Sequence, residues 1–324
     1  MSATLGARAI LEKLGPVPLL SSPGRQFPVE RRYTRYSAAS LEEQVRDAIG
    51  TLDLEGRTGP QGHVLVFLPG AAEIRKAMQA CAGLSRHGTL LLPLHGDLPT
   101  AEQDRAIGAS THRKIIFSTN VAESSITIDG VCAVVDSGLA RIPSWSAWSG
   151  LNRLRVEKIS RSSVIQRAGR AGRTGPGIAI HLFTEEDFRR RPEHHVPEIA
   201  KADLASLLLQ LTAMDLDASV LPWLQAPPEP AVEHARLLLQ RLGAMRDNGQ
   251  LTEQGRLMST LPLHPRLARL VIAAGESGCF DDGVQVAARL AEGRLRLDEN
   301  DRASFVSDIE AMLATPASGN TRRL

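Results

Sequence analysis

The sequence predicts an α/β domain built on a parallel sheet, followed by a helical region. Between about residues 28 and 183, short apolar runs of strand length alternate with helical patterns. Unbroken runs of Val, Ile and Leu are typical of parallel strands that helices cover on both faces. After about residue 190, apolar residues recur at helical spacing instead. The 324 residues are enough for two domains and part of a third.

Five apolar runs are the expected strands of the sheet. They are Val64–Leu68, Leu90–Leu92, Ile115–Ser118, Val131–Val135 and Ile178–Phe183. Helical patterns separate several of them, at Ala71–Cys81 and Ala101–Gly108 among others. Ligands of such sheets bind beyond the carboxyl ends of the strands, so we expect binding residues in the loops that follow the strands.

The helical region begins with Leu204–Met214, for which Asp203 is the expected N-cap. A Pro-rich connector, a second helix, a turn and a helix capped by Thr252 follow. Their bounds are Leu221–Pro230, Ala231–Met245 and Asp247–Gly249. Two helices, a hairpin-like turn and a third helix are compatible with a winged-helix module. From Leu263 onward the pattern is again helical.

Composition excludes several classes of protein. The formal net charge is +2, so a nucleic-acid partner cannot be argued from global charge and any basic surface must be local. Cys81, Cys132 and Cys279 form no CxxC pair, which argues against a zinc site or a disulfide framework and fits a reducing cytoplasm. No apolar run approaches the roughly 18 residues of a membrane span. Glu12 and Lys13 interrupt the N-terminal apolar stretch, so we expect no signal peptide.

The most informative segment is Gln166–Gly177, QRAGRAGRTGPG, in which Arg167, Arg170 and Arg173 stand among small residues. Positions 166, 170 and 173 are spaced by four and three, so on a helix they share one face. Small residues let another surface approach, and guanidinium forks match phosphate oxygens. The segment therefore predicts phosphate recognition, with a solvated basic helix as the alternative.

The same string resembles motif VI of the DEAH-box helicases, QRxGRxGR. Other segments resemble the motifs of this family in the family's order: Ser2-Ala3-Thr4 (motif III), Val64–Ile74 (motif IV), Leu94–Leu98 (motif IVa), Lys114–Gly130 (motif V) and Val134–Arg141. FPVERRY, VLVFLPG, KADLASLLLQL and LPLHPRLARL resemble the HrpB subgroup of bacterial members. Residues 195–290 resemble the winged-helix and ratchet-type region that follows in the family.

The resemblance implies a RecA-like parallel-sheet domain followed by an all-α winged-helix and ratchet region. The expected domains are a remnant of a first RecA-like domain at 1–25, the second RecA-like domain at 26–190, a winged-helix-like domain at 191–262 and a partial ratchet-type domain at 263–324. In the family, ATP binds between two RecA-like domains. The resemblance thus implies that the intact protein couples ATP hydrolysis to translocation along a strand and to unwinding.

The resemblance also implies roles for individual residues. On the nucleotide side, Arg170 and Arg173 act as fingers on the phosphates and Gln166 orders the attacking water. The other nucleotide-binding residues expected are Thr127, Asp129 and Gly130. The expected nucleic-acid contacts are Ser118, Thr119, Asn120, Gly70, His95, Arg141 and Arg153. No metal ligand is expected on this chain.

Each of these residues also has a structural interpretation. Asp129 can cap a turn, and the hydroxyls of Ser118 and Thr119 can cap the end of a strand. His95 can be a packed loop histidine, and Glu123 can be an ion-pair partner of an arginine. The basic segment at 151–176 has seven cations and one acid, a local charge of +6 that suits salt-sensitive phosphate contacts, but it can equally be a solvated face.

The departures from the family pattern bear on activity. The 324 residues contain no GxxxxGK[ST] and no DEAH box, so the phosphate loop and the Mg²⁺ carboxylates of an ATP site are expected in a first RecA-like domain that this chain lacks. We therefore expect a truncated gene product or a partial gene model that is inactive alone, with single-stranded RNA or DNA and ATP as partners and no membrane. The alternative is a stand-alone, catalytically inactive nucleic-acid-binding or regulatory module.

The stretch Leu139–Lys158 predicts a β-hairpin, because a Ser-rich turn with a Ser-Gly pair separates two flanks of strand character. Its position between motifs V and VI resembles a hairpin that the helicases project where a duplex meets a single strand. Trp145 and Trp148 lie near the expected tip. They can stack on a base or pack against a neighbouring domain.

Overall fold

The computed structural model describes residues 7–15, 17–18, 20, 27–54, 62–85, 88–124, 126–146, 151–292 and 307–314. The chain divides into two compact units: Met1–Ser144 with Arg153–Pro197, and Trp145–Asn152 with Glu198–Leu324. The segment Ser2-Ala3-Thr4, which resembles motif III, lies outside the described residues.

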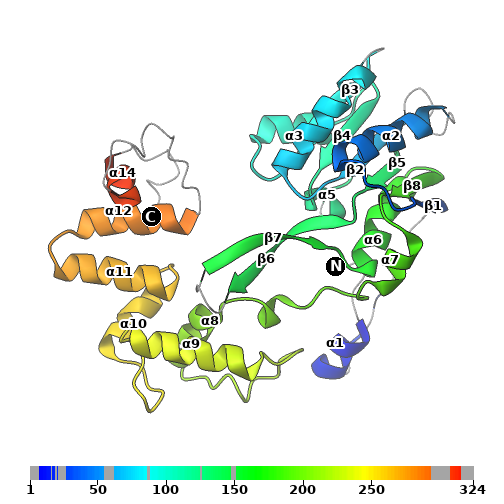
Figure 1. Ribbon diagram of the computed structural model, residues 1–324. Helices are drawn as coiled ribbons and strands as arrows, with labels where there is room; N and C mark the ends of the chain where they lie inside the picture. The colour runs from blue at the N-terminus through cyan, green and yellow to red at the C-terminus, as the bar shows by residue number, and fades with distance from the viewer. Residues whose placement is uncertain are drawn as a thin grey trace. The chain divides into compact units, whose positions relative to one another are not determined.

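The first unit is built on a six-stranded sheet in the order β1-β8-β5-β2-β4-β3, and all neighbouring strands are parallel (Figure 1). The strands are β1 (Val29–Tyr33), β2 (His63–Phe67), β3 (Leu90–Leu94), β4 (Lys114–Ser118), β5 (Val131–Asp136) and β8 (Gly177–His181). Every residue of β2 and β4 is buried, as expected for central parallel strands. The predicted α/β class is confirmed, and all five predicted strands are present.

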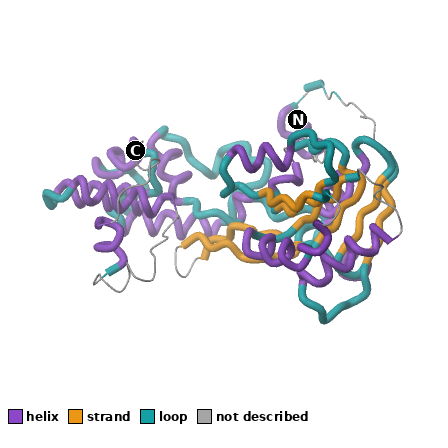
Figure 2. The backbone as a smooth tube through the Cα atoms, turned by 90° about the horizontal axis from the view of Figure 1, so that it is seen from above, coloured by secondary structure: helices purple, strands orange, loops and turns teal. Residues whose placement is uncertain are grey.

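Helices cover both faces of this sheet, as Figure 2 shows. One face carries α2 (Leu41–Leu54) and α3 (Ala71–Ala80). The other carries α4 (Thr100–Ile107), α5 (Val121–Ser124), α6 (Arg161–Ala168) and the 3-10 helix η2 (Gly169–Gly172). Short helices α1 (Ala7–Leu14), η1 (Ala82–Ser85) and α7 (Glu185–Arg190) complete the unit.

A buried lysine fixes one end of the sheet to a helix. The side chain of Lys114, at the start of β4, is 1% exposed, and its Nζ donates to the carbonyls of Ala106 (3.1 Å), Arg105 (3.3 Å) and Gly108. These carbonyls lie at the end of α4 and have no partner within the helix. A cation at a helix C-terminus also complements the helix dipole. Lys114 therefore joins β4 to α4.

The predicted hairpin is present as β6 (Leu139–Ser146) and β7 (Leu151–Lys158), which form a separate two-stranded sheet. Trp145 and Arg153 lie on these strands, whereas Trp148 lies outside the described residues. The root of β6 follows directly from β5 through Ser137 and Gly138. The hairpin thus begins at the carboxyl edge of the main sheet.

Apart from the hairpin tip at Trp145–Asn152, the second unit is helical. Its elements are η3 (Glu198–Ala200), α8 (Ala205–Ala213), α9 (Glu229–Arg241), α10 (Glu253–Thr260), α11 (Pro265–Glu276), α12 (Phe280–Glu292) and α14 (Asp308–Ala314). The predicted turn is closed by an antiparallel bridge between Met245 and Leu251. Thr252 accepts from the N–H of Gly255 at 2.9 Å, so this predicted cap is confirmed.

The start of α8 is tied to the start of α11 by a single carboxylate. Asp203 accepts from the N–H of Ala205 at 2.8 Å and pairs with Nε2 of His264 at 3.1 Å. Burial alone would raise the pKa of Asp203, but the bonds to His264 and Ala205 hold it below its ordinary value. The side chains of α11 pack into the same core as those of α8, α9 and α10.

Candidate nucleic-acid and nucleotide interface

The segment that resembles motif VI is not one continuous α-helix. Helix α6 begins after Ser160, whose hydroxyl accepts from the N–H of Ser163 at 3.3 Å, and it ends at Ala168. The 3-10 helix η2 takes over at Gly169. The predicted alignment of positions 166, 170 and 173 on one α-helical face is therefore wrong. Because the helix type changes at Gly169, successive arginines point into different surroundings.

The small residues of this segment serve close packing within the chain. A Cβ at Gly172 would lie 2.6 Å from the carbonyl oxygen of Phe27 and 2.7 Å from a methyl of Val29. The N–H of Phe27 donates to the carbonyl of Gly172 at 2.9 Å. The surface that approaches motif VI here is thus the backbone that leads into β1.

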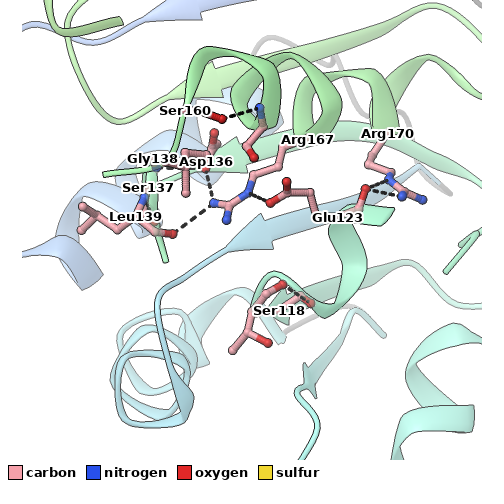
Figure 3. Close-up of polar contacts among 12 residues, drawn as sticks. Ser118, Glu123, Asp136, Ser137, Gly138, Leu139, Ser160, Arg167 and Arg170 are labelled. Atoms are coloured by element: carbon pink, nitrogen blue, oxygen red, sulfur yellow. Dashed lines mark hydrogen bonds and ion pairs between the residues drawn. The ribbon is translucent and has the colours of Figure 1, made fainter. Parts of the chain in front are cut away.

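Arg167 is the most deeply buried cation of the site. Its side chain is 0% exposed. Figure 3 shows that it contacts residues of three separate elements. Nη1 donates to Oδ1 of Asp136 at 2.9 Å and to the carbonyl of Leu139 at 3.1 Å, while Nε donates to Oε2 of Glu123 at 2.9 Å. The guanidinium also lies 4.8 Å from the centre of the Phe67 ring. Arg167 is therefore an internal brace, and the interpretation of Glu123 as an ion-pair partner is confirmed.

Asp136 is the acceptor at the centre of this brace. Burial alone would raise the pKa of its carboxyl, but Arg167, His181 and the N–H of Gly138 together hold the pKa below its ordinary value. Nδ1 of His181 lies 3.5 Å from Oδ2 of Asp136, and its ring stacks on Tyr33 with centroids 4.9 Å apart. The ends of β5 and β8 are thus locked to α6 through one buried carboxylate.

Arg170 is also largely buried, with 5% of its surface exposed. Its Nε donates to the carbonyl of Glu123 at 3.0 Å, and its Nη1 and Nη2 donate to the carbonyls of Ile126 and Glu123. Burial, and then the neighbouring charge of Arg173, lower the pKa of Arg170 to about 10. It remains a cation at neutral pH. In this conformation its donors hold the backbone of the segment that resembles motif V.

Arg173 is exposed, and its Nη1 donates to the hydroxyl of Thr127, which is exposed as well. The structure thus brings together one predicted residue from motif V and one from motif VI. Gln166 is half-buried on α6. Of the seven cations counted between residues 151 and 176, Arg167 and Arg170 are buried. The predicted basic surface is therefore smaller than the sequence count implied.

Asp129 and Gly130 lie at the other edge of the sheet. They form the turn that precedes β5, and the carbonyl of Gly130 accepts from the N–H of His63 at the start of β2. Gly130 has a φ of 78°, which favours glycine, and a Cβ there would lie 3.4 Å from Cδ2 of the His63 ring. The motif V segment therefore runs from the carboxyl edge, after β4, to the amino edge, before β5.

Apart from Arg153, which lies on β7 of the hairpin, the residues expected to touch nucleic acid lie at the carboxyl edge of the main sheet. Thr119 and Asn120 follow β4, and Asn120 is exposed. Ser118 is 0% exposed, and its hydroxyl donates to the carbonyl of Thr119 at 2.9 Å, which is the strand-end capping role. His95 follows β3 and is half-buried. Ser118 has no exposed surface with which to contact a nucleic-acid strand, whereas Thr119 and Asn120 are at least partly exposed.

Two further predicted contacts lie directly against each other. Gly70 is the N-cap of α3, and a Cβ on it would lie only 2.7 Å from both Cζ and Nε of Arg141. Arg141 reaches this position from β6. Nothing in the spacing of the sequence joins residue 70 to residue 141. Only the order of the strands, with β5 beside β2, makes them neighbours.

Comparison with known proteins gives the family. The model of the helicase conserved C-terminal domain matches residues 43–175, and the model of the winged-helix helicase associated domain (HA2) matches residues 235–263. A crystal structure of the Escherichia coli DEAH/RHA helicase HrpB superposes with a TM-score of 0.86 at 35% identity, covering 96% of this chain and 40% of that chain. The chain carries the conserved C-terminal helicase domain of DEAH/RHA-type helicases. The expected similarity to HrpB is confirmed.

Curated members of the DEAH/RHA helicase family give the same result. The ATP-dependent RNA helicase HrpB of Escherichia coli is 37% identical over 294 residues, which are 90% of this chain and 35% of that protein. The ATP-dependent RNA helicase HrpA of the same organism is 36% identical over 299 residues, which are 90% of this chain and 23% of that protein. The chain thus spans well under half the length of these relatives.

The described residues fit a nucleotide phosphate in one respect and not in another. Arg173 offers an exposed guanidinium, whereas the donors of Arg170 are already bonded to carbonyls. Within the described ranges, no group of three or more His, Cys, Asp or Glu side chains could hold a metal ion. In the same part of the chain, no helix is long and apolar enough to cross a membrane.

Proposed function

We propose that this chain supplies the second half of the motor of an ATP-dependent RNA helicase. The observation that supports the proposal most directly is the set of hydrogen bonds that two arginines make to one short segment. Residues 119–127 start with the polar end of β4, at Thr119 and Asn120, and end at Thr127 under Arg173. Arg170 holds the carbonyls in between. A strand at one end of this segment and a nucleotide at the other would share it.

On the nucleotide side, phosphoryl transfer needs in-line positioning and neutralisation of the charge on the γ-phosphoryl oxygens. Arg173 is the finger that this geometry favours, because it is exposed and oriented by Thr127. Arg170 can join it only after releasing the carbonyls of Glu123 and Ile126. Gln166 would orient the attacking water, and Asp129 would lie near the nucleotide. ATP would bring Mg²⁺, which neutralises phosphate charge when bound.

On the nucleic-acid side, the proposal assigns backbone contacts and no base contacts. The Thr119 hydroxyl, Asn120, His95 and the Gly70–Arg141 site offer donors that suit phosphate and sugar oxygens. Such contacts hold a strand without reading its sequence. The hairpin β6–β7 begins at the same edge and carries Arg141 near its root. It is the candidate element for separating the strands of a duplex.

The proposal keeps the domain assignment expected from the sequence. We place the second RecA-like domain at 26–190, the winged-helix-like domain at 191–262 and a partial ratchet-type domain at 263–324, with 1–25 belonging to a first RecA-like domain. The partners that follow are single-stranded RNA or DNA, ATP, and a first RecA-like domain that carries the phosphate loop and the DEAH carboxylates.

A second function is favoured by one fact about the sequence. The 324 residues contain neither a phosphate loop nor a DEAH box. The chain could then act as a catalytically inactive nucleic-acid-binding or regulatory module. Both functions include binding of a single strand, and they differ in whether the nucleotide residues serve hydrolysis.

The test measures strand binding and hydrolysis separately. Fluorescence anisotropy with labelled single-stranded RNA should show binding that weakens steeply with salt. A plot of the logarithm of the binding constant against the logarithm of the salt concentration should have a slope of roughly −0.7 per phosphate neutralised. The chain alone should release no phosphate from ATP, because positioning and metal neutralisation supply most of the rate of this reaction. Joined to a first RecA-like domain that carries a phosphate loop and a DEAH box, it should support RNA-stimulated hydrolysis.

Two outcomes would contradict the motor assignment. Steady-state hydrolysis by the chain alone that Arg173→Ala abolishes would show a complete site on this chain. Hydrolysis that the joined protein carries out equally well with Arg173→Ala and Arg170→Ala would show that motif VI does not serve the nucleotide. The second result, with strand binding intact, would favour the regulatory module.

A further inference from the structure

A carboxylate, that of Glu73, pairs with Arg141, one of the proposed contacts to a nucleic-acid strand. Glu73 lies in the first turn of α3, and its Oε2 is 3.5 Å from Nη2 of Arg141 on β6. The two side chains are 29% and 41% exposed, so solvent and a ligand can reach both of them. The pair joins two elements that are 68 residues apart in the sequence.

The place where this pair forms is shaped for an oxyanion. Gly70, the N-cap of α3, has an extended φ of −167° that any residue can adopt, so glycine is needed there for space. A Cβ would lie 2.7 Å from the Arg141 guanidinium and 2.9 Å from Oε2 of Glu73. Gly70 has no side chain to cap the helix, which leaves the first N–H groups of α3 beside the guanidinium. The N-terminus of α3, the Arg141 guanidinium and the Glu73 carboxylate thus meet at one point.

We propose that Glu73 is an internal substitute for nucleic-acid phosphate: it holds Arg141 over the start of α3 when no strand is bound, and a backbone phosphate displaces it. The proposal rests on the proposed strand-binding function. Carboxylate and phosphate both match the guanidinium fork, so they compete for the same donors. An ion pair this exposed is weak enough to be exchanged. Glu73 thereby lowers the affinity for the strand and makes the Arg141 contact easy to release.

A simpler role for Glu73 makes a different prediction. An acidic residue in the first turn of a helix is favourable because of the helix dipole, whatever Arg141 does. An acid near a strand site can also repel phosphate through space without any competition. In both of these cases, the effect of Glu73 on strand binding would not depend on Arg141.

The experiment is a double-mutant cycle on the full chain. The variants are Glu73→Gln, Arg141→Gln and the double variant, with Glu102→Gln on α4 as a control for loss of an exposed acid. The affinity for a labelled single-stranded RNA of mixed sequence is measured by anisotropy between about 50 mM and 500 mM salt, a range that screens exposed pairs. Thermal melting of each variant confirms that it is folded.

With Arg141 present, Glu73→Gln should bind RNA about two- to fivefold more tightly at low salt, the range that an exposed pair supplies. The gain should vanish at high salt. With Arg141→Gln, the same change should give no gain, and Glu102→Gln should give none in either background. An equal gain in both backgrounds, or none in either while Arg141→Gln weakens binding, would overturn the proposal. If the unaltered chain binds no RNA at low salt, the strand-binding function itself fails, and the proposal fails with it.

Discussion

Replacing Arg167 with methionine would remove the one guanidinium that joins β5, the hairpin root and α5. Its Nη1 bonds to Asp136 at 2.9 Å and to the carbonyl of Leu139, and its Nε bonds to Glu123 at 2.9 Å. Arg167 and Asp136 are both 0% exposed. Methionine fills a similar space next to Phe67, so the change removes the charge and the donors more than the packing.

The expected cost is large because of what remains behind. Removing one partner of a buried ion pair typically costs about 3–5 kcal/mol, since the other charge stays buried and uncompensated. Asp136 would be that charge. Arg167→Lys should cost less than the methionine variant but still destabilise, because one ammonium cannot span Asp136, Glu123 and the Leu139 carbonyl with the geometry of a guanidinium.

Hydrogen exchange followed by mass spectrometry is the suitable assay. The chain has two compact units, so a single melting temperature would mix two transitions. Peptides that cover β4 and β5 report the opening of the first unit alone. Arg167→Met should lower their opening free energy by about 3–5 kcal/mol. Peptides from α9 and α10 should be unchanged.

The pH dependence follows from Asp136. Its pKa in the folded protein is below the ordinary value, so its ionised form contributes stability that is present above about pH 3.9 and lost as the pH falls through the folded pKa. Without Arg167, burial dominates and raises that pKa. The cost of Arg167→Met should therefore be largest near pH 7 and should shrink toward about pH 4.

Two controls decide whether the reasoning holds. Arg173→Met removes a cation from the same segment, but an exposed one, and should cost less than about 0.5 kcal/mol. Adding Asp136→Asn to Arg167→Met removes the stranded charge and should recover part of the lost stability. If Arg167→Met and Arg173→Met cost the same, or if Asp136→Asn makes the double variant worse by its full single cost, the buried pair is not what holds these elements together.

The other predictions concern single side chains. Arg170→Met should leave two backbone carbonyls without donors, so exchange in peptides of the motif V segment should show an opening free energy lower by about 1–3 kcal/mol. In the protein joined to a first RecA-like domain, Arg173→Met should lower kcat for ATP about 10³-fold and leave that exchange unchanged. Lys114→Met should cost about 1–3 kcal/mol, seen as faster exchange in α4, and unchanged exchange there would refute its role as the helix C-cap. Thr119→Val should weaken single-strand RNA binding by about 1 kcal/mol for every sequence tested, and a loss confined to one sequence would show a base contact instead.

The sheet could be predicted from the sequence because its central strands are apolar throughout. One strand escaped prediction, β1, whose sequence VERRY has three charged residues in a row. It lies at the edge of the sheet, where one side faces no strand and charged side chains are tolerated. Its place is set by pairing with β8 and by the close approach of Phe27 to Gly172, which are contacts between segments far apart in the chain.

The candidate site was predictable in its residue types but not in its distribution of roles. Three arginines three residues apart look alike in the sequence, yet Arg167 is a buried brace, Arg170 holds carbonyls and Arg173 alone is exposed. The point where α6 gives way to η2 decides this difference, and local spacing does not reveal it. Glu73 was also missed as part of the site, because only the neighbouring positions of β2 and β5 bring α3 beside the hairpin root.

In the proposed function, the donors of Arg170 would link the two binding sites. For Arg170 to reach a phosphate, it must leave the carbonyls of Glu123 and Ile126, at a cost of about 1–3 kcal/mol for groups left without a partner. A charge-assisted bond to phosphate returns a similar amount, about 1.5–3 kcal/mol. Because these energies nearly balance, a small shift in the backbone after Thr119, where a strand would bind, would change which state Arg170 prefers. A coupling free energy of about 1–3 kcal/mol is the usual size for linked sites. The hydrogen bonds of this one segment would therefore suffice to connect strand binding to nucleotide binding without any larger rearrangement of the sheet.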